Sequence, residues 1–148
     1  MKKKPLILSY DMSSFMWRGL LARKDTENGK LVEFNGKEVL INSAIHGFEN
    51  VLEYMLMVIK DYRAAPIDCI LVFEGVNSKS KRLLINKTYK AGSEKPPEQY
   101  EQFGILRDML TTFWKDLGAQ VMWQDFAEGD DTCAYLAKHS EEDIIIAT

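Results

Sequence analysis

The chain has 148 residues, of which 46% are apolar and 28% are charged, and its formal net charge is −3. This length suits one domain with a single well-buried core, and the composition is that of a soluble globular protein. The small negative charge excludes a general attraction to nucleic acid, so any such binding needs a local basic patch. Cys69 and Cys133 lie far apart and form no CxxC pair, which indicates small core residues in a reducing compartment.

No apolar run approaches the roughly 20 residues that a membrane-spanning helix needs. The start, MKKKPLILSYD, has the basic flank of a signal peptide, but its apolar run covers only residues 6–8. We therefore expect a cytoplasmic protein with no membrane partner.

The first part of the chain predicts a strand, a helix, a hairpin and a second helix. Residues 5–11 (PLILSYD) indicate a short buried strand, and residues 13–24 a helix with Phe15, Leu20 and Leu21 in the core. Asn35-Gly36 lies between two alternating runs in residues 29–40, which predicts a hairpin with a type I′ turn. Residues 42–62 predict a long amphipathic helix that starts at Asn42 or Ser43. The expected core positions of that helix are Ala44, Ile45, Phe48, Val51, Leu52, Met55, Ile59 and Tyr62.

The second part alternates strands and helices. Residues 67–75 (IDCILVFEG) are almost continuously apolar, as expected for a parallel strand covered on both faces. A basic polar stretch follows at about 76–97, and residues 98–117 predict a helix stopped by Gly118. Residues 120–124 indicate a third strand, the acidic run that follows opens another helix, and residues 143–148 indicate a fourth strand.

This alternation predicts an α/β fold with a mostly parallel twisted sheet and helices on both faces, in a single domain that spans residues 1–148. A nucleotide- or small-ligand-binding domain is one function that such a fold allows. No Gly-rich phosphate loop of the GxGxxG or GxxxxGK[ST] kind is present in the sequence, which counts against nucleotide binding.

Acidic residues follow three of the predicted strands. Asp11 ends the first strand and Glu74 the second, while Glu128, Asp130 and Asp131 lie between the third strand and the next helix. Ligands of open α/β sheets gather at the carboxyl ends of the strands, so we expect these side chains in one crevice. Each acid alone has a structural explanation as a helix cap or loop residue. Together they would repel one another unless a cation is present, and oxygen ligands favour Mg²⁺ or Mn²⁺.

Six basic residues occur in the polar stretch that follows Glu74. Such a stretch is usually a solvated loop, but its position beside the proposed metal site suits a phosphodiester substrate. Lysine and arginine would neutralise phosphates, and Tyr89 offers a stacking face for a base. The basic residues are Lys79, Lys81, Arg82, Lys87, Lys90 and Lys95.

Six motifs in chain order resemble the amino-terminal part of the 5′ nucleases, which include flap endonucleases, phage 5′–3′ exonucleases and the 5′-nuclease domain of bacterial DNA polymerase I. LILSYDMSSFMWR resembles the opening strand with its metal-binding Asp, and ILVFEG the second strand with its acid. KRLLINKTYKAG resembles the basic start of the family's arch, and AEGDDTCAYLA its third acidic motif. NSAIHGFENVLEYML and DIIIAT resemble the intervening helix and the strand that precedes the last acids.

The resemblance implies a PIN-like 5′-nuclease fold with a basic, arch-like segment at about 76–97, and hydrolysis of DNA phosphodiester bonds with two Mg²⁺ or Mn²⁺ ions. The substrate would be DNA with a 5′ end or flap, and Arg82 or Lys81 would steer the scissile phosphate. The residues implied for the first metal are Asp11, Glu74, Glu128, Asp130 and Asp131. The residues expected to contact DNA, from the resemblance or the basic stretch, are Ser13, Arg18, Lys79, Lys87, Tyr89 and Lys90.

The chain departs from the family pattern at three places. Glu74 stands where the family usually has Asp, and Ser93 stands where a basic residue is usual. The family pattern also continues past IIIAT with two Asp residues for a second metal and with a helical module that grips duplex DNA, neither of which is in these 148 residues. We therefore expect a chain that is truncated at its carboxy-terminal side: a fragment, a subunit that a second polypeptide completes, or a reduced relative that binds DNA without efficient cleavage.

The leading prediction is a metal-dependent 5′ nuclease, or the part of one that holds the first metal. One alternative is a non-catalytic nucleic-acid-binding remnant or subunit that needs a second chain. A PIN-type ribonuclease is a less favoured alternative.

Overall fold

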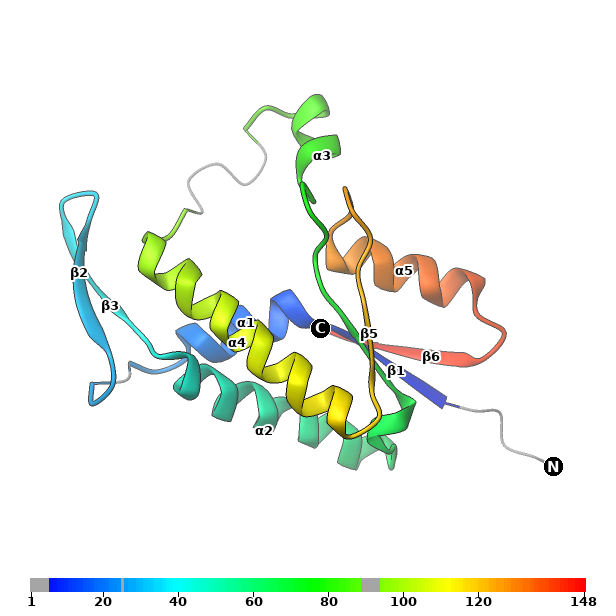
Figure 1. Ribbon diagram of the computed structural model, residues 1–148. Coiled ribbons are helices and arrows are strands. Elements are labelled where there is room, and N and C mark those ends of the chain that lie inside the picture. The colour runs from blue at the N-terminus through cyan, green and yellow to red at the C-terminus, as the bar shows by residue number, and fades with distance from the viewer. Residues whose placement is uncertain (1–5, 25, 89–93) are drawn as a thin grey trace.

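A parallel four-stranded sheet in the order β5-β4-β1-β6 forms the centre of the computed structural model, which describes residues 6–24, 26–88 and 94–148 (Figure 1). The middle strand β1 pairs with β4 on one side, Leu8 opposite Cys69, and with β6 on the other, Leu6 opposite Asp143. The predicted α/β fold with a mostly parallel sheet is therefore confirmed. The strands are β1 (Leu6–Asp11), β4 (Cys69–Val72), β5 (Gln120–Met122) and β6 (Asp143–Ala147).

Helices cover both faces of this sheet. Alternate strand residues point to opposite sides, so Leu8 and Leu71 join one apolar cluster while Ile70 and Val72 join another. The helices on the first side are α1 (Met12–Leu21), α2 (Ala44–Tyr62) and α4 (Pro97–Asp116), and α5 (Gly129–His139) contributes Cys133 to the second side. Across the described parts of the chain, no helix is both long and apolar enough to cross a membrane.

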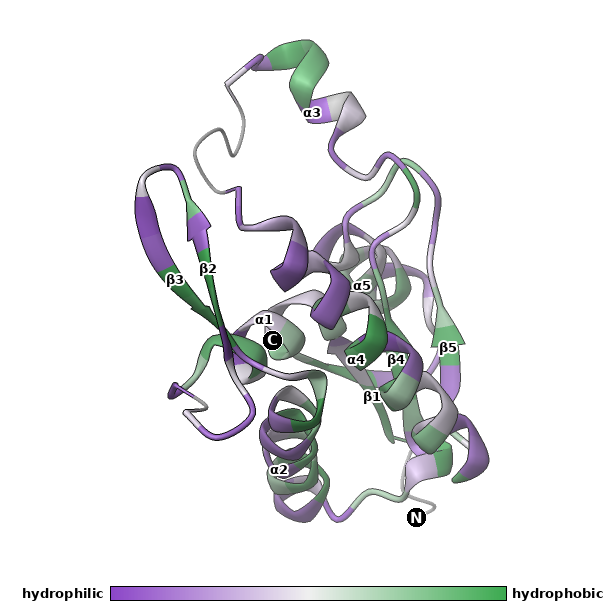
Figure 2. Cartoon of the chain, turned by 60° about the vertical axis from the view of Figure 1, so that its left-hand side comes forward, coloured by the Kyte–Doolittle hydropathy of each residue, from purple (hydrophilic) through white to green (hydrophobic). Residues whose placement is uncertain are grey.

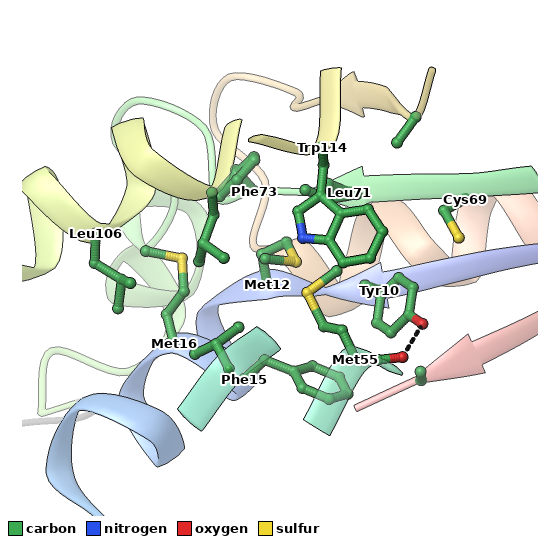
Figure 3. Packing of buried hydrophobic residues seen from close by; sticks show 14 of the residues in the cluster. Tyr10, Met12, Phe15, Met16, Met55, Cys69, Leu71, Phe73, Leu106 and Trp114 are labelled. Carbon is green, nitrogen blue, oxygen red and sulfur yellow. Dashed lines mark hydrogen bonds between the residues drawn. The ribbon is translucent and has the colours of Figure 1, made fainter. Parts of the chain in front are cut away.

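The larger core lies between the sheet and the first group of helices. Tyr10, Met55 and Trp114 are fully buried at its centre (Figure 3). The Tyr10 hydroxyl donates a hydrogen bond of 2.9 Å to the backbone carbonyl of Met55, which joins β1 to α2. Burying a large apolar side chain stabilises a fold by about 1.5–3 kcal/mol, so this layer holds the strands and helices in a fixed relation.

The predicted hairpin is confirmed as β2 (Lys30–Phe34) and β3 (Lys37–Ile41), and it stands away from the sheet (Figure 1). Asn35 and Gly36 have φ angles of 52° and 76°, as a type I′ turn requires. Of the two predicted caps for α2, Ser43 accepts a hydrogen bond from the His46 backbone N–H. Asn42 instead donates to the carbonyls of Leu20 and Arg23 at the end of α1.

Several element details differ from the sequence prediction. Ile45 is 62% exposed and Tyr62 46% exposed, so the predicted apolar stripe of α2 is wider than the face that is buried. Leu21 is also exposed, because α1 ends there rather than at residue 24. The second strand is shorter than predicted, since β4 ends at Val72 and is preceded by a 3-10 turn, η1 (Pro66–Asp68).

A short helix that the sequence did not predict interrupts the basic stretch. It is α3 (Ser80–Ile85), and both views place it apart from the sheet (Figures 1 and 2). Leu84 and Ile85 are 86% and 90% exposed, so α3 buries little apolar surface against the body of the protein.

Candidate functional site

A cleft of about 530 Å³ lies at the carboxyl end of the sheet. Four of the five predicted metal ligands line it, namely Asp11, Glu74, Glu128 and Asp130. Parallel strands direct their carboxyl ends to the same edge, which explains why acids separated by more than 100 positions in the sequence lie together.

Asp11 reaches from the end of β1 to the start of α5. It occupies the N-cap position of α1, yet its side chain makes no capping hydrogen bond to that helix within the described residues. A Cβ atom placed on Gly129 would lie 2.7 Å from Asp11 Oδ1, closer than real Cβ contacts allow. The carboxylate of Asp11 therefore occupies space that only a glycine leaves open at the first residue of α5.

Glu74 is positioned by two loops that run side by side. The Phe73 N–H donates to the Met122 carbonyl at 2.9 Å, the Gly75 N–H to the Ala127 carbonyl at 3.1 Å, and the Phe126 N–H to the Val76 carbonyl at 2.8 Å. These bonds join the segment after β4 to the segment after β5, and the Glu74 side chain accepts a hydrogen bond of 3.4 Å from the Ser78 hydroxyl.

Glu128 and Asp131 form ion pairs with Arg82 of α3. Arg82 Nη1 lies 3.0 Å from Glu128 Oε1, and Arg82 Nη2 lies 2.7 Å from Asp131 Oδ1. Glu128 is only 3% exposed, and a buried carboxylate needs such a compensating charge. Asp131 faces away from the cleft and lines a neighbouring groove with Trp123 and Tyr135.

Asp130 lies in the first turn of α5, where the positive end of the helix dipole favours an acid. Its Oδ1 accepts a hydrogen bond of 2.8 Å from the Asp131 N–H. Beneath it, burial raises the pKa of the Cys133 thiol, and the charges of Asp11 and Asp130 raise it further, against a lowering by the Ser9 hydroxyl. The negative charges of Asp11 and Asp130 thus both raise the pKa of the same thiol.

Cationic and aromatic residues also line the cleft. The predicted DNA-contacting residues Ser13, Arg18 and Lys79 all line it. Arg18 Nη2 donates a hydrogen bond of 3.4 Å to the Ser14 hydroxyl, and the guanidinium lies 5.2 Å from the centre of the Phe15 ring.

Lys95, which belongs to the predicted basic stretch, also lines the cleft, and the structure adds Trp17 and Tyr100, which the sequence analysis did not name as site residues. Lys95 Nζ lies 4.3 Å from the centre of the Trp17 ring, Trp17 stacks on Phe103 at 4.1 Å, and Tyr100 meets Trp17 edge-on at 5.7 Å. A signal for Trp17 was present, because it lies one helical turn after Ser13 and so shares its face of α1. Tyr100 belongs to the apolar pattern that predicts the helix over residues 98–117, but it is exposed at the start of α4.

Arg107 of α4 is a further cation near the acids that the sequence analysis missed. Its guanidinium lies 4.5 Å from the centre of the Phe73 ring and 5.9 Å from that of Trp123. Burial lowers the pKa of Arg107, and the negative charges of Asp108 and Glu74 oppose that lowering. Arg107 lies outside the basic stretch, so charge clustering in the sequence gave no indication of it.

The remaining predicted residues have different positions. Lys87 is exposed beyond the end of α3 and does not line the cleft. Tyr89 and Lys90 lie outside the described residues, and so does the side chain of Lys81, whose backbone belongs to α3.

The donor chemistry of the cleft fits a hard divalent cation, since four carboxylates line it. In the arrangement seen here, the described residues contain no group of three or more acids, histidines or cysteines that could hold a metal ion together. The Arg82 ion pairs are part of this arrangement, because they direct Glu128 and Asp131 to a guanidinium.

Comparison with protein-family models, with curated proteins and with solved structures finds no match to this chain. Its function is therefore inferred from the cleft and from the motifs that form it.

Proposed function

We propose that this chain is a divalent-metal-dependent 5′ nuclease acting on DNA, or the part of one that holds the first metal ion. In this proposal the sheet and helices form a PIN-like domain. The six motifs that resemble that family support the proposal.

The cleft itself is the observation on which the proposal depends. The cleft is lined by the carboxylates of Asp11, Glu74, Glu128 and Asp130 and by cations and aromatic rings, including Lys79, Lys95 and Trp17. Acids suit a cation, cations suit phosphates, and exposed rings suit unpaired bases. This combination of acids, cations and rings in one cleft is what a site for phosphodiester cleavage needs.

The acids, the cations and the aromatic ring have different roles in this proposal. Asp11, Glu74, Glu128 and Asp130 would hold Mg²⁺ or Mn²⁺, directly or through water, and the ion would supply charge neutralisation and an activated water. Lys79, Lys95 and Arg18 would bind backbone phosphates and so orient the scissile bond. The exposed ring of Tyr100 would offer a stacking face to an unpaired base near the DNA end.

A second candidate function is a nucleic-acid-binding subunit that does not cut by itself. One observation favours it: among the described residues, no three acidic, histidine or cysteine side chains lie close enough together to hold a metal ion. A second polypeptide would then supply the acids of the second metal site.

The test is cleavage of a 5′-labelled flap DNA in Mg²⁺ or Mn²⁺ by the wild-type chain and by Asp130→Ala. We expect metal-dependent cleavage that falls at least about 100-fold in the variant, because loss of a metal ligand removes charge stabilisation of the transition state. Asp116→Ala is the matched control, since Asp116 is exposed at the far end of α4 and should leave the rate unchanged.

Salt-sensitive binding of the flap DNA without cleavage by the wild-type chain would support the binding subunit instead. Preferential cleavage of single-stranded RNA would indicate a ribonuclease. Absence of any nucleic-acid affinity at low salt would contradict all three functions.

A further inference from the structure

Arg82 connects two carboxylates that face different hollows of the surface. Glu128 lines the acidic cleft, and Asp131 lines the neighbouring groove with Trp123 and Tyr135. One guanidinium contacts both, at 3.0 Å and 2.7 Å. Arg82 therefore lies at the boundary between the two hollows. It pairs with Glu128, which the proposed metal ion would need as a ligand.

The same contact attaches α3 to α5. The apolar residues Leu83, Leu84 and Ile85 of α3 are all exposed, so hydrophobic packing holds this helix only weakly. The two charged contacts from Arg82 span 46 and 49 positions of sequence and bring α3 against the start of α5. Arg82 is held at two points, because each of its two terminal nitrogens contacts a different carboxylate. Such charge-assisted contacts are stronger than neutral hydrogen bonds.

We propose that Arg82 is a latch that competes with the metal ion for Glu128. In the metal-free protein the guanidinium compensates the buried carboxylate and holds α3 at the cleft. When a divalent cation takes over that compensation, Arg82 and α3 are released, and the guanidinium becomes available to a phosphate. This inference rests on the proposed function, because it requires metal binding in the cleft.

The state in which Arg82 pairs with Glu128 and the state in which a metal ion binds Glu128 exclude each other for electrostatic reasons. Glu128 is 3% exposed, so its charge must be balanced by a neighbouring cation in either state. A guanidinium and a metal ion that share one carboxylate would repel each other at short distance. The free-energy cost of displacing Arg82 therefore makes metal binding by the wild-type chain less favourable.

The test is titration calorimetry with Mn²⁺ on the full chain and on Arg82→Gln and Arg82→Lys. We expect Arg82→Gln to bind Mn²⁺ roughly five- to tenfold more tightly than the wild type, because a charged hydrogen bond no longer has to be broken. Arg82→Lys keeps the charge without the two-pronged geometry and should give an intermediate gain. Lys79→Gln removes the same charge from the same cleft, outside the Arg82 bridge, and should gain less than about twofold.

Amide hydrogen exchange provides a second measurement. In the wild type, Mn²⁺ should accelerate exchange across α3, whereas in Arg82→Gln exchange there should be fast with or without the ion. If Arg82→Gln is poorly folded, the comparison of Arg82→Lys with the wild type tests the same order of affinities.

The possible outcomes distinguish a failure of the Arg82 latch from a failure of the proposed metal-dependent function. Equal or weaker Mn²⁺ binding by Arg82→Gln, or an equal gain in Lys79→Gln, would overturn the latch and leave the nuclease proposal intact. Failure of the wild type and every variant to bind Mn²⁺ would overturn the metal-dependent function, and the latch with it.

Discussion

Gly129 is the position at which a single methyl group would disturb the cleft most directly. A Cβ there would meet Asp11 Oδ1 at 2.7 Å and would push the carboxylate out of its place. We predict that Gly129→Ala lowers flap cleavage by at least about tenfold while costing only about 1 kcal/mol of stability, because the displaced group is a carboxylate at the cleft. Cleavage rate and thermal unfolding measure the two effects separately.

Gly104→Ala is the matched control for Gly129→Ala. Gly104 lies in α4, and a Cβ there would meet no atom within 4 Å. Alanine should therefore stabilise the helix by about 0.5–1 kcal/mol and leave cleavage unchanged. An activity of Gly129→Ala equal to that of this control would contradict the importance of the Asp11 position.

Individual site residues were predictable to different degrees. The positions of Asp11 and Glu74 follow from strand ends, which apolar runs identify well, and the structure brings both to the same cleft. The pairing of Arg82 with Glu128 was not predictable, because it depends on the direction that α3 takes after β4. Tyr100 was misassigned because an aromatic residue at helical spacing is indistinguishable in sequence from a core residue.

At the scale of elements, the paired loops after β4 and β5 determine where Glu74 lies. Gly75 allows their close approach, since a Cβ there would be 1.9 Å from the Gln124 carbonyl oxygen. We predict that Gly75→Ala destabilises the protein by about 2–4 kcal/mol, because backbone atoms would have to move apart. Equilibrium urea unfolding measures this loss.

Val76→Ala controls for a change in the same loop. Val76 is exposed, so truncating its side chain should alter the free energy of unfolding by no more than about 0.5 kcal/mol. A Gly75→Ala variant as stable as Val76→Ala would show that the two loops can separate without cost.

Elements with a strong local signal agree well with the sequence prediction. The hairpin turn at Asn35-Gly36 and the buried strand β4 each have one dominant cause, a turn that needs positive φ and a run of apolar residues. The helix α3 has neither signal, because its residues SKRLLI begin with charges and bury little. The sequence therefore predicted only a basic polar stretch there, since tertiary charge contacts rather than periodicity position this helix.

At the scale of the whole molecule, the chain is acidic, with a formal net charge of −3. Nucleic acid should therefore bind weakly, and only through the cations that line the cleft, which are Arg18, Lys79 and Lys95. We predict that the affinity for flap DNA falls linearly with salt on logarithmic axes and that Lys79→Gln and Lys95→Gln each reduce the slope by about 1.

Lys115→Gln is the control for the salt dependence, because Lys115 is in the last turn of α4, at the opposite end from Lys95. It should leave the slope unchanged. An equal change of slope in all three variants would indicate diffuse attraction instead of a defined phosphate path.

The position of β1 in the sheet has a consequence for how the protein is made. β1 is synthesised before both of its neighbours in the sheet, which are β4, starting at Cys69, and β6, starting at Asp143. Until β6 has been synthesised, one edge of the apolar strand β1 has no partner, and pairing over such sequence distances is slow. The growing chain therefore holds an incomplete sheet until β6 has been made, and a nascent-chain chaperone that covers β1 would protect it from aggregation during that interval.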